Sequence, residues 1–239
     1  MIEVKGISKR FGKLEVLRAV NATFGKGSSY AIIGPNGSGK TTLIKSILGM
    51  VLPDAGQITV DGVSVAGHWN YRRQIGYMPQ IGRYPDNMKI GQLLGMIRDL
   101  RPDVKTTNDE LIRELRLEEL SGKRMHTLSG GTRQKVSAAI SFLFDPAVLI
   151  LDEPTAGLDP LSVEILKAKI LREKERGKVF LITSHIMSDL DELCSDILYI
   201  EEGVVRYSNT LAELKRESGE EKLGRAIARM MRQNFNAGT

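Results

Sequence analysis

The stretch "YAIIGPNGSGKTTLIKSIL", Tyr30 to Leu48, decides how the rest of this sequence is interpreted. A short apolar run leads into the glycine-rich segment Gly34–Thr42, and a helical pattern follows it. This is the G-x-x-x-x-G-K-[ST] pattern in the strand–loop–helix context that it requires. The glycines let successive backbone N–H groups converge on phosphate oxygens at a helix N-terminus, which favours an anion. The stretch therefore predicts a phosphate-binding loop (P-loop) in an α/β fold.

The residue types of this loop match a nucleotide and its metal ion. Lys40 supplies a charge to the β- and γ-phosphates, and the hydroxyl of Thr41 can bind Mg²⁺. The placement between a strand and a helix disfavours the alternative of a plain glycine-rich turn. We expect the following residues to contact the nucleotide: Gly34, Pro35, Asn36, Gly37, Ser38, Gly39, Lys40, Thr41 and Thr42.

A second element, "VLILDEP" from Val148 to Pro154, is a buried strand that ends in two carboxylates. Its position predicts that Asp152 holds the water shell of Mg²⁺, as the second-strand aspartate does in P-loop NTPases. Adjacent side chains of a strand point in opposite directions, so Glu153 is a candidate general base. The alternative, a strand-end turn with a helix cap, loses weight beside the upstream P-loop.

A histidine follows the next apolar strand, "VFLITSH", which ends at His185. Parallel strands bring their carboxyl ends to one edge of the sheet, where ligands bind, so His185 is expected to approach the γ-phosphate. A lone histidine is more often structural, but this position favours a function. His68 and His126 show no metal-ligand spacing, and no role is assigned to them.

The segment "TLSGGTRQKVSAA", Thr127 to Ala139, places a Ser-Gly-Gly turn directly before a predicted helix. Such a turn exposes backbone N–H groups at a helix N-terminus and is a second anion site. The residues alone do not explain why one chain should carry two anion sites.

Short apolar strands alternate with helical stretches through most of the chain, which predicts parallel strands with crossover helices. Two regions depart from this pattern. The N-terminal part, "IEVKGISKRFGKLEVLRAVNATF" with "GQITVDGVSV", is expected to be antiparallel. Residues 81–144 lack a convincing strand and show three helical patterns: "IGQLLGMIRDL", "NDELIRELRLEEL" and the helix after Gly131.

Composition limits the class of protein. The chain has 239 residues, 41% of them hydrophobic, which is typical of a globular protein. The net charge of +5 suits an acidic partner (nucleotide, nucleic acid or anionic lipid) or merely solubility. The single cysteine, Cys194, excludes an intramolecular disulfide. No apolar run approaches the roughly 18 residues of a membrane span, so we expect a soluble chain with no span of its own.

The ordered segments "GPNGSGKTT", "YMPQ", "LSGGTRQ", "LILDEP", "AGLD" and "SH" resemble the ATP-binding subunit of ATP-binding cassette (ABC) transporters. The resemblance extends to about residue 210. It implies a P-loop NTPase (RecA-like) core with an antiparallel β subdomain over residues 1–80 and 145–210, a helical subdomain over 81–144, and a helical tail over 211–239.

The resemblance also explains the second glycine turn. It implies a dimer in which Ser129, Gly130 and Gly131 of one chain cap the γ-phosphate bound by the other chain's P-loop. Asp159, in "AGLD", resembles the residue that connects the two sites. Thr132 stands where the family usually has glutamine, which puts its role in doubt.

The remaining site residues are carried over by motif. Thr41, Gln80 and Asp152 resemble the residues that form the Mg²⁺ shell in the family. Gln80 also resembles the start of the segment that senses the membrane partner. Glu153 resembles the catalytic base, and His185 the residue that holds the γ-phosphate and water in line. Phe11 matches the aromatic that stacks on adenine, for which only a ring face is needed. ATP and Mg²⁺ are thus the implied cofactors.

The resemblance implies a homodimer that drives a separate membrane permease from the inner, cytoplasmic face of the membrane, with no nucleic acid. A single short cassette resembles two-component exporters. "SGGTRQK" and "HIMSDLDEL" further resemble the ATPase subunits of Nos transporters, which implies copper processing for nitrous-oxide reductase maturation. The alternatives are a non-transport ABC ATPase acting on DNA or ribosomes, and a nucleotide kinase or GTPase, which "LSGG" disfavours.

The tail contains an amphipathic, basic pattern, "EEKLGRAIARMMR". Leu223, Ile227, Met230 and Met231 share one helical face, and Lys222, Arg225, Arg229 and Arg232 the other. Packing on its own domain, on the second subunit, or on anionic lipid or the permease all remain open.

Overall fold

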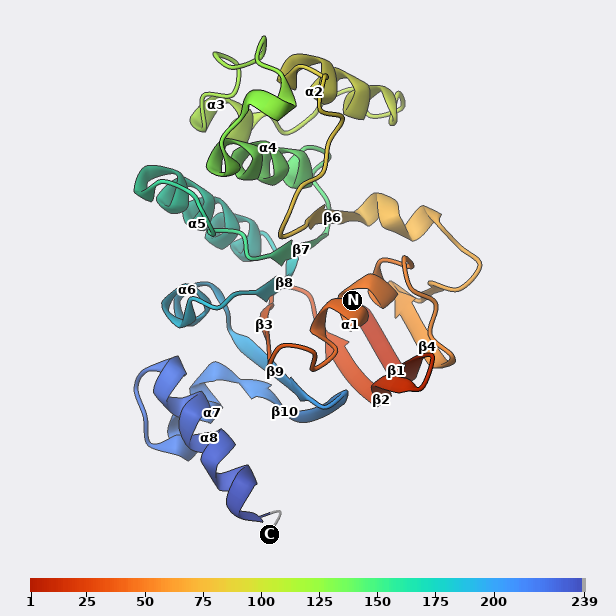
Figure 1. The fold of residues 1–239 in the computed structure, drawn as a ribbon, viewed down its shortest axis with the longest axis vertical. Helices are drawn as coiled ribbons and strands as arrows, with labels where there is room; N and C mark the ends of the chain where they lie inside the picture. The colour runs from red at the N-terminus through yellow and green to blue at the C-terminus, as the bar shows by residue number, and fades with distance from the viewer. Residues whose placement is uncertain (238–239) are drawn as a thin grey trace. The chain divides into compact units, whose positions relative to one another are not determined.

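The computed structural model describes the backbone of residues 1–237 and the side chains of residues 1–232. The chain divides into two compact units. The P-loop unit comprises residues 1–72 together with the chain from residue 179 onward, and the signature unit comprises residues 73–178. Figure 1 labels most of the helices and strands of both units. The last two residues of the predicted tail lie outside the described residues.

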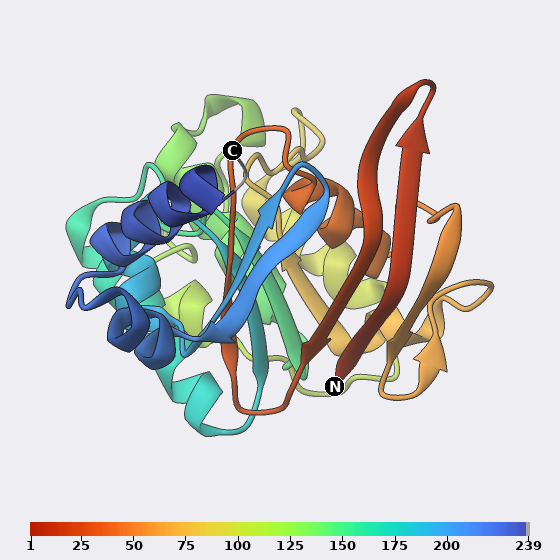
Figure 2. The same ribbon diagram turned by 90° about the horizontal axis from the view of Figure 1, so that it is seen from below.

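The P-loop unit contains an antiparallel sheet and a set of mainly parallel strands. The antiparallel sheet has the order β2-β1-β4-β5, and Figure 2 shows its long β1–β2 hairpin with β4 beside β1. Its strands are β1 (Ile2–Phe11), β2 (Leu14–Phe24), β4 (Ala55–Val60) and β5 (Val63–Ser64). The antiparallel N-terminal part predicted from the sequence is thereby confirmed.

The other strands of this unit form the order β10-β9-β3-β8. Strand β3 pairs in parallel with β8 and β9, whereas β9 and β10 form an antiparallel hairpin. Strands and helices of this part are β3 (Ser29–Ile33), β8 (Val179–Thr183), β9 (Asp196–Glu201), β10 (Val204–Thr210), α1 (Lys40–Ile47), α6 (Met187–Leu193), α7 (Leu211–Ser218) and α8 (Leu223–Ala237). The short helix η1 (Asn70–Gln74) spans the point in the chain where the first unit ends and the second begins. Every residue of β8 is buried, as its nearly continuous apolar sequence predicts.

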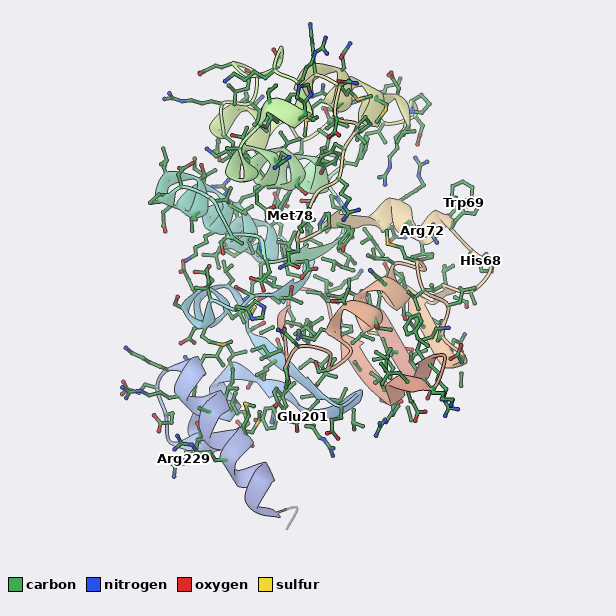
Figure 3. The ribbon with its side chains drawn as sticks, viewed as in Figure 1. His68, Trp69, Arg72, Met78, Glu201 and Arg229 are labelled. Carbon is green, nitrogen blue, oxygen red and sulfur yellow. The ribbon has the colours of Figure 1, made fainter. Side chains whose placement is uncertain are left out.

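The tail helix α8 packs its apolar face on its own unit, against α6 and α7. Leu223, Ile227 and Met230 are buried, whereas Arg225 and Arg229 of the basic face are exposed. Figure 3 labels Arg229 on this face, 4.0 Å from Glu220. The predicted separation of apolar and basic residues is therefore present, and the apolar face is covered within the unit.

The signature unit pairs two parallel strands with a group of helices. Its elements are β6 (Ile75–Met78), β7 (Val148–Asp152), α2 (Ile90–Asp99), α3 (Glu110–Glu114), η2 (Met125–Thr127), α4 (Gly130–Phe142) and α5 (Pro160–Glu175). Between β6 and β7, residues 79–147 contain helices and no strand. Helix α4 packs against α2, α3 and β6, and α3 also contacts α5.

The predicted helix over "NDELIRELRLEEL" is wrong in its length, because α3 ends at Glu114. Arg116 adopts the left-handed φ of 53°, and Leu117 N–H donates to the carbonyl of Ile112 at 2.9 Å. This is a Schellman ending, in which an apolar residue just past the helix packs back on it. Leu117 is buried. Its burial through a turn produces the same apolar spacing as a longer helix, which is why the pattern misled.

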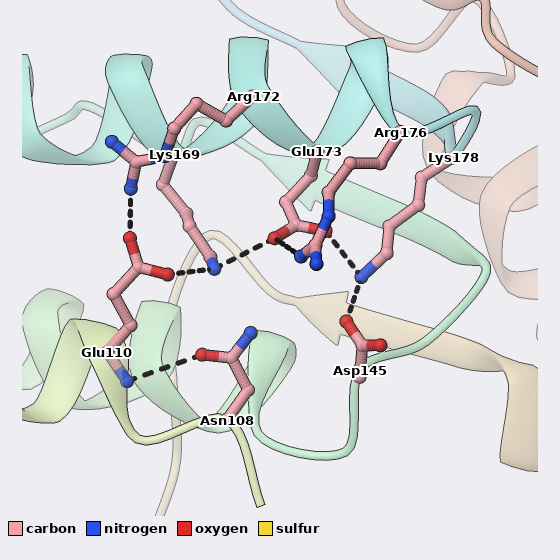
Figure 4. Close-up of polar contacts among 8 residues, drawn as sticks. All are labelled: Asn108, Glu110, Asp145, Lys169, Arg172, Glu173, Arg176 and Lys178. Atoms are coloured by element: carbon pink, nitrogen blue, oxygen red, sulfur yellow. Dashed lines mark hydrogen bonds and ion pairs between the residues drawn. The ribbon is translucent and has the colours of Figure 1, made fainter.

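At the C-terminal half of α5, charged side chains connect this helix to the rest of the signature unit (Figure 4). The ammonium of Lys169, which is fully buried, lies 2.5 Å from Glu110 of α3 and 2.9 Å from Glu173. Lys178 pairs with both Glu173 and Asp145. Burial alone would raise the pKa of Glu173, but the bonds from Lys178 and Lys169 outweigh it and lower that pKa to about 2.

Candidate nucleotide site

Two glycines of the P-loop, Gly34 and Gly39, leave no room for a side chain. A Cβ on Gly34 would lie 1.9 Å from the carbonyl oxygen of Ile200, and one on Gly39 would lie 2.8 Å from that of Val16. Gly39 is also the N-cap of α1, with φ 109° and no side-chain cap. Because Gly39 has no side chain to cap them, the first N–H groups of α1 form an anion-binding helix N-terminus.

Two polar side chains complete the loop. The ammonium of Lys40 donates to the carbonyls of Gly34 and Pro35 at 2.7 and 2.8 Å, so the side chain folds back across the loop. The hydroxyl of Ser38 is buried and has no hydrogen-bond partner among the described residues. A buried hydroxyl of this kind has its bonding capacity left for a ligand oxygen.

The P-loop unit also carries Phe11 and His185. Phe11 ends β1 at the tip of the β1–β2 hairpin, and its ring is half exposed with the Lys9 ammonium 5.5 Å from the centroid. His185 is exposed just after β8, the parallel neighbour of β3. The carboxyl ends of β3 and β8 thus bring the P-loop and His185 to the same edge. His68 and Trp69, which Figure 3 labels, belong to the loop that directly precedes η1.

In the signature unit, two predicted polar residues follow neighbouring parallel strands. Gln80 comes shortly after β6, and Asp152 ends β7. The strands pair in register, with Met78 opposite Leu151, so both residues reach one edge of this pair. Burial raises the pKa of the Tyr77 hydroxyl, and the negative charge of Asp152 raises it further.

Glu153 is buried, and strand alternation does not orient its side chain. Its φ of 53° is left-handed, a rare conformation for a non-glycine residue that clusters at functional sites. The buried side-chain amide of Gln134 donates to its backbone carbonyl at 2.9 Å. The prediction that Glu153 points the other way along a strand is wrong in its reason, because β7 ends at Asp152 and the chain turns there.

The Ser129–Gly131 turn begins α4. Ser129 is the N-cap, and its hydroxyl accepts the Thr132 N–H at 3.2 Å and lies 2.9 Å from the Thr132 hydroxyl. Gly130 is exposed with nothing near its absent side chain, whereas a Cβ on Gly131 would meet the carbonyl of Gly157 at 2.4 Å. The unusual Thr132 therefore contacts the signature serine within the same turn.

A groove of about 790 Å³ in the signature unit brings several of these residues together. Gln80, Gly130 and Gly131 line it, with Tyr84, Gln134 and Gly157. Desolvation by burial raises the pKa of Tyr84. The segment after Gln80 and the signature turn thus share one concave surface.

Lys135 is not among the site residues predicted from the sequence. Its ammonium lies 2.6 Å from Oδ2 of Asp159, the N-cap of α5. Gly131 and Lys135 are four residues apart and share a face of α4, and this spacing was the available signal.

The sequence matches a family model described as ABC transporter over residues 17–156. Nod factor export ATP-binding protein I of Ralstonia nicotianae is 31% identical over 208 residues, or 85% of this chain and 65% of that protein. The ABC transporter ATP-binding protein YtrB of Bacillus subtilis is 33% identical over 219 residues, or 91% and 74%. The chain therefore spans about two thirds to three quarters of these relatives.

Solved structures agree. The ATP-binding subunit of an ABC transporter superposes with a TM-score of 0.86 at 29% identity, covering 97% of this chain and 99% of that one. A dimeric cassette in a post-hydrolysis state with ADP and Pi gives 0.77 at 22% identity, covering 88% and 98%, and this similarity shows the fold alone.

The fold and the site define an α/β ATP-binding cassette with a P-loop and an inserted helical segment that carries a signature turn. The chain belongs to the ABC transporter family, as an ATP-binding subunit and ATPase. None of the described helices is both long and apolar enough to span a bilayer.

Proposed function

We propose that this chain hydrolyses ATP as one half of a homodimer and thereby drives a separate membrane permease of the exporter type. The observation that carries the proposal is the presence of two helix N-termini suited to anions, at α1 and at α4. Only the first has a closed loop with a lysine. A second chain would explain the N-terminus of α4, because the γ-phosphate of the ATP bound by that chain's P-loop would meet the exposed Ser129–Gly131 turn.

In this proposal the P-loop binds the phosphates of ATP. Lys40 would turn from the loop carbonyls to the phosphate oxygens, and the buried Ser38 hydroxyl would gain a partner. The half-exposed ring of Phe11 offers a face for adenine stacking. His185 would hold the γ-phosphate from the neighbouring strand end.

Mg²⁺ is the implied metal, and the donors fit it. Thr41, Gln80 and Asp152 offer hydroxyl, amide and carboxylate oxygens, which hard cations prefer. The described residues hold no group of three or more His, Cys, Asp and Glu side chains suited to a metal. This is expected for Mg²⁺, which is held by one or two carboxylates together with substrate phosphates. When bound, the ion would neutralise phosphate charge.

Glu153 is the proposed general base. Its side chain is 7% exposed beside the Mg²⁺ donor Asp152, and its backbone is held by Gln134. A carboxylate fixed in this way can accept a proton from the water that attacks the γ-phosphorus. The signature turn of the partner would close the same phosphate from the other side and stabilise the charge that develops on its oxygens.

The cargo would be selected by the permease. The relatives named for Nod factor export favour an exporter, and none of the reported relatives is named for copper or nitrous-oxide reductase. The copper-processing role stays a hypothesis that purification of the permease with this chain would test. The attachment to a permease would place the chain at the inner face of the cell membrane. No observation favours action on DNA or ribosomes.

The test is the variant Glu153→Gln. It should bind Mg·ATP normally, hydrolyse it roughly 10²–10⁴-fold more slowly because the base is gone, and accumulate as an ATP-bound dimer. Phosphate release and size-exclusion chromatography with ATP or ADP measure the two effects. Wild-type hydrolysis in this variant would overturn the assignment.

A further inference from the structure

The signature helix is attached to the segment that carries Glu153 at three points within one chain. The carbonyl of Gly157 closely approaches Gly131, the Gln134 amide donates to the Glu153 carbonyl at 2.9 Å, and Lys135 pairs with Asp159 at 2.6 Å. Gln134 and Lys135 follow Gly131 by three and four residues, about one helical turn, so one face of α4 makes all three contacts. This face lies along the whole segment from Glu153 to Asp159.

The carboxylate of Asp159 is fully engaged within its own chain. Oδ1 accepts the Ser162 N–H at 3.0 Å, and Oδ2 accepts the Ser162 hydroxyl at 2.8 Å in addition to Lys135. The Lys135 ammonium, followed by the two bonds from Ser162, holds the pKa of Asp159 well below its usual range. The group therefore remains a carboxylate that caps α5 and attracts Lys135.

The segment between the attachments depends on them. Glu153 and Gly157 both have left-handed φ angles, 53° and 73°. Two turn hydrogen bonds of 3.2 Å stabilise this stretch, from Ala156 N–H to the Glu153 carbonyl and from Leu158 N–H to the Thr155 carbonyl. A non-glycine residue in this region persists only where its surroundings hold it. The Gln134 and Lys135 contacts stand at the two ends of this segment.

We propose that Lys135 is a positioning residue that holds the Glu153–Asp159 segment against the signature helix, so that the signature turn and the base of one chain move together. The inference rests on the proposed function. Each chain's turn would contact its partner's ATP while its Glu153 serves its own, so Lys135 would couple the two sites through a single chain. It touches no substrate and acts through Asp159.

We expect the Lys135–Asp159 ion pair to affect the coupling between the two ATP sites more than the stability of the fold. The side chains of Lys135 and Asp159 are 21% and 50% exposed, and ion pairs of this kind contribute little to folding. The buried Lys169–Glu173 network at the other end of α5 is the opposite case (Figure 4). Removing the charge of Lys135 should therefore leave the fold intact, which makes its kinetic effect interpretable.

The test compares Lys135→Met, which keeps the stem and removes the charge, with Lys135→Arg, which keeps the charge. Lys215→Met is the matched control, because it breaks an ion pair of intermediate exposure with Asp191 on α6. We expect Lys135→Met to lower kcat about tenfold and to reduce the Hill coefficient for ATP, with KM and Tm near wild type. Lys135→Arg should restore most of kcat, and Lys215→Met should change neither.

A second variant guards against a folding defect. Asp159→Asn still caps α5 but loses the charge, and the double variant Lys135→Met/Asp159→Asn should lose no more kcat than the larger single loss, because both act through one contact. Wild-type kcat in Lys135→Met, or additive losses in the double variant, would overturn the inference. If Glu153→Gln traps a dimer as expected, such a result removes the coupling role alone; if it does not, the proposed function itself fails.

Discussion

The two glycine turns of this chain differ in how complete they are. The P-loop has a left-handed N-cap glycine, a lysine folded across it and a buried hydroxyl, and its Gly34 has no space for even a methyl group. The signature turn is exposed, its N-cap serine already bonds Thr132, and its Gly130 faces open space. The P-loop is a preformed anion-binding site, whereas the signature turn is an exposed helix N-terminus.

This difference indicates that phosphate affinity and phosphate closure are separate tasks. A cradle with converging donors binds its ligand without help, because its geometry is fixed before binding. An exposed helix N-terminus contributes little until another surface excludes water from it. Variants of the two turns should therefore fail in different ways.

The largest expected effect comes from Ser129→Arg. The added side chain should keep the turn from the partner's γ-phosphate and lower hydrolysis by at least about 10²-fold, as loss of oxyanion-type stabilisation does. Mg·ATP affinity of the isolated chain should remain near wild type, measured by fluorescent-nucleotide titration.

Lys40→Ala should instead lose both affinity and hydrolysis. The exposed residue Glu119 provides the control for Ser129→Arg, since Glu119→Arg adds the same side chain to a different turn of the same unit. Weak ATP binding by Ser129→Arg would contradict the separation of the two tasks.

A smaller effect distinguishes the glycines themselves. Gly34→Ala places its Cβ against the Ile200 carbonyl and should lower the free energy of unfolding by about 1–3 kcal/mol, the usual cost of overpacking. Gly130→Ala has open space and a negative φ, so it should leave stability unchanged. Thermal unfolding of both variants measures the contrast, and equal destabilisation would show that the two turns are packed alike.

The smallest effect concerns acid. The pKa of Glu173 is lowered to about 2 in the folded chain, below the range of an unfolded glutamate, so its stabilising contribution is present above the unfolded value and is lost as pH falls toward 2. Between about pH 4 and pH 2.5, amide protection of α3 and α5 should therefore decline before that of α1. Hydrogen exchange read by mass spectrometry tests this, and simultaneous loss would contradict it.

The sequence was most informative where the structure is local. The P-loop, its strand and its helix are contiguous, so spacing alone predicts the glycine positions and Lys40. The paired ends of β3 and β8, and of β6 and β7, follow from the rule for parallel strands.

It was least informative where distant segments meet or the backbone leaves regular structure. The Gln134–Glu153 bond joins residues 19 positions apart, and no periodicity encodes the packing of α4 that creates it. The turn at Glu153 and the Schellman ending at Arg116 both use left-handed non-glycine residues, which residue type does not signal.

The most direct test of the two-half-site account mixes two inactive variants. Lys40→Ala has an intact signature turn, and Ser129→Arg an intact P-loop, so each mixed dimer would contain one complete site. An equimolar mixture should recover about a quarter of wild-type ATPase activity, since about half of the dimers are mixed and one of their two sites is intact. A mixture no more active than the separate variants, over a concentration range in which the wild type dimerises with ATP, would contradict the account.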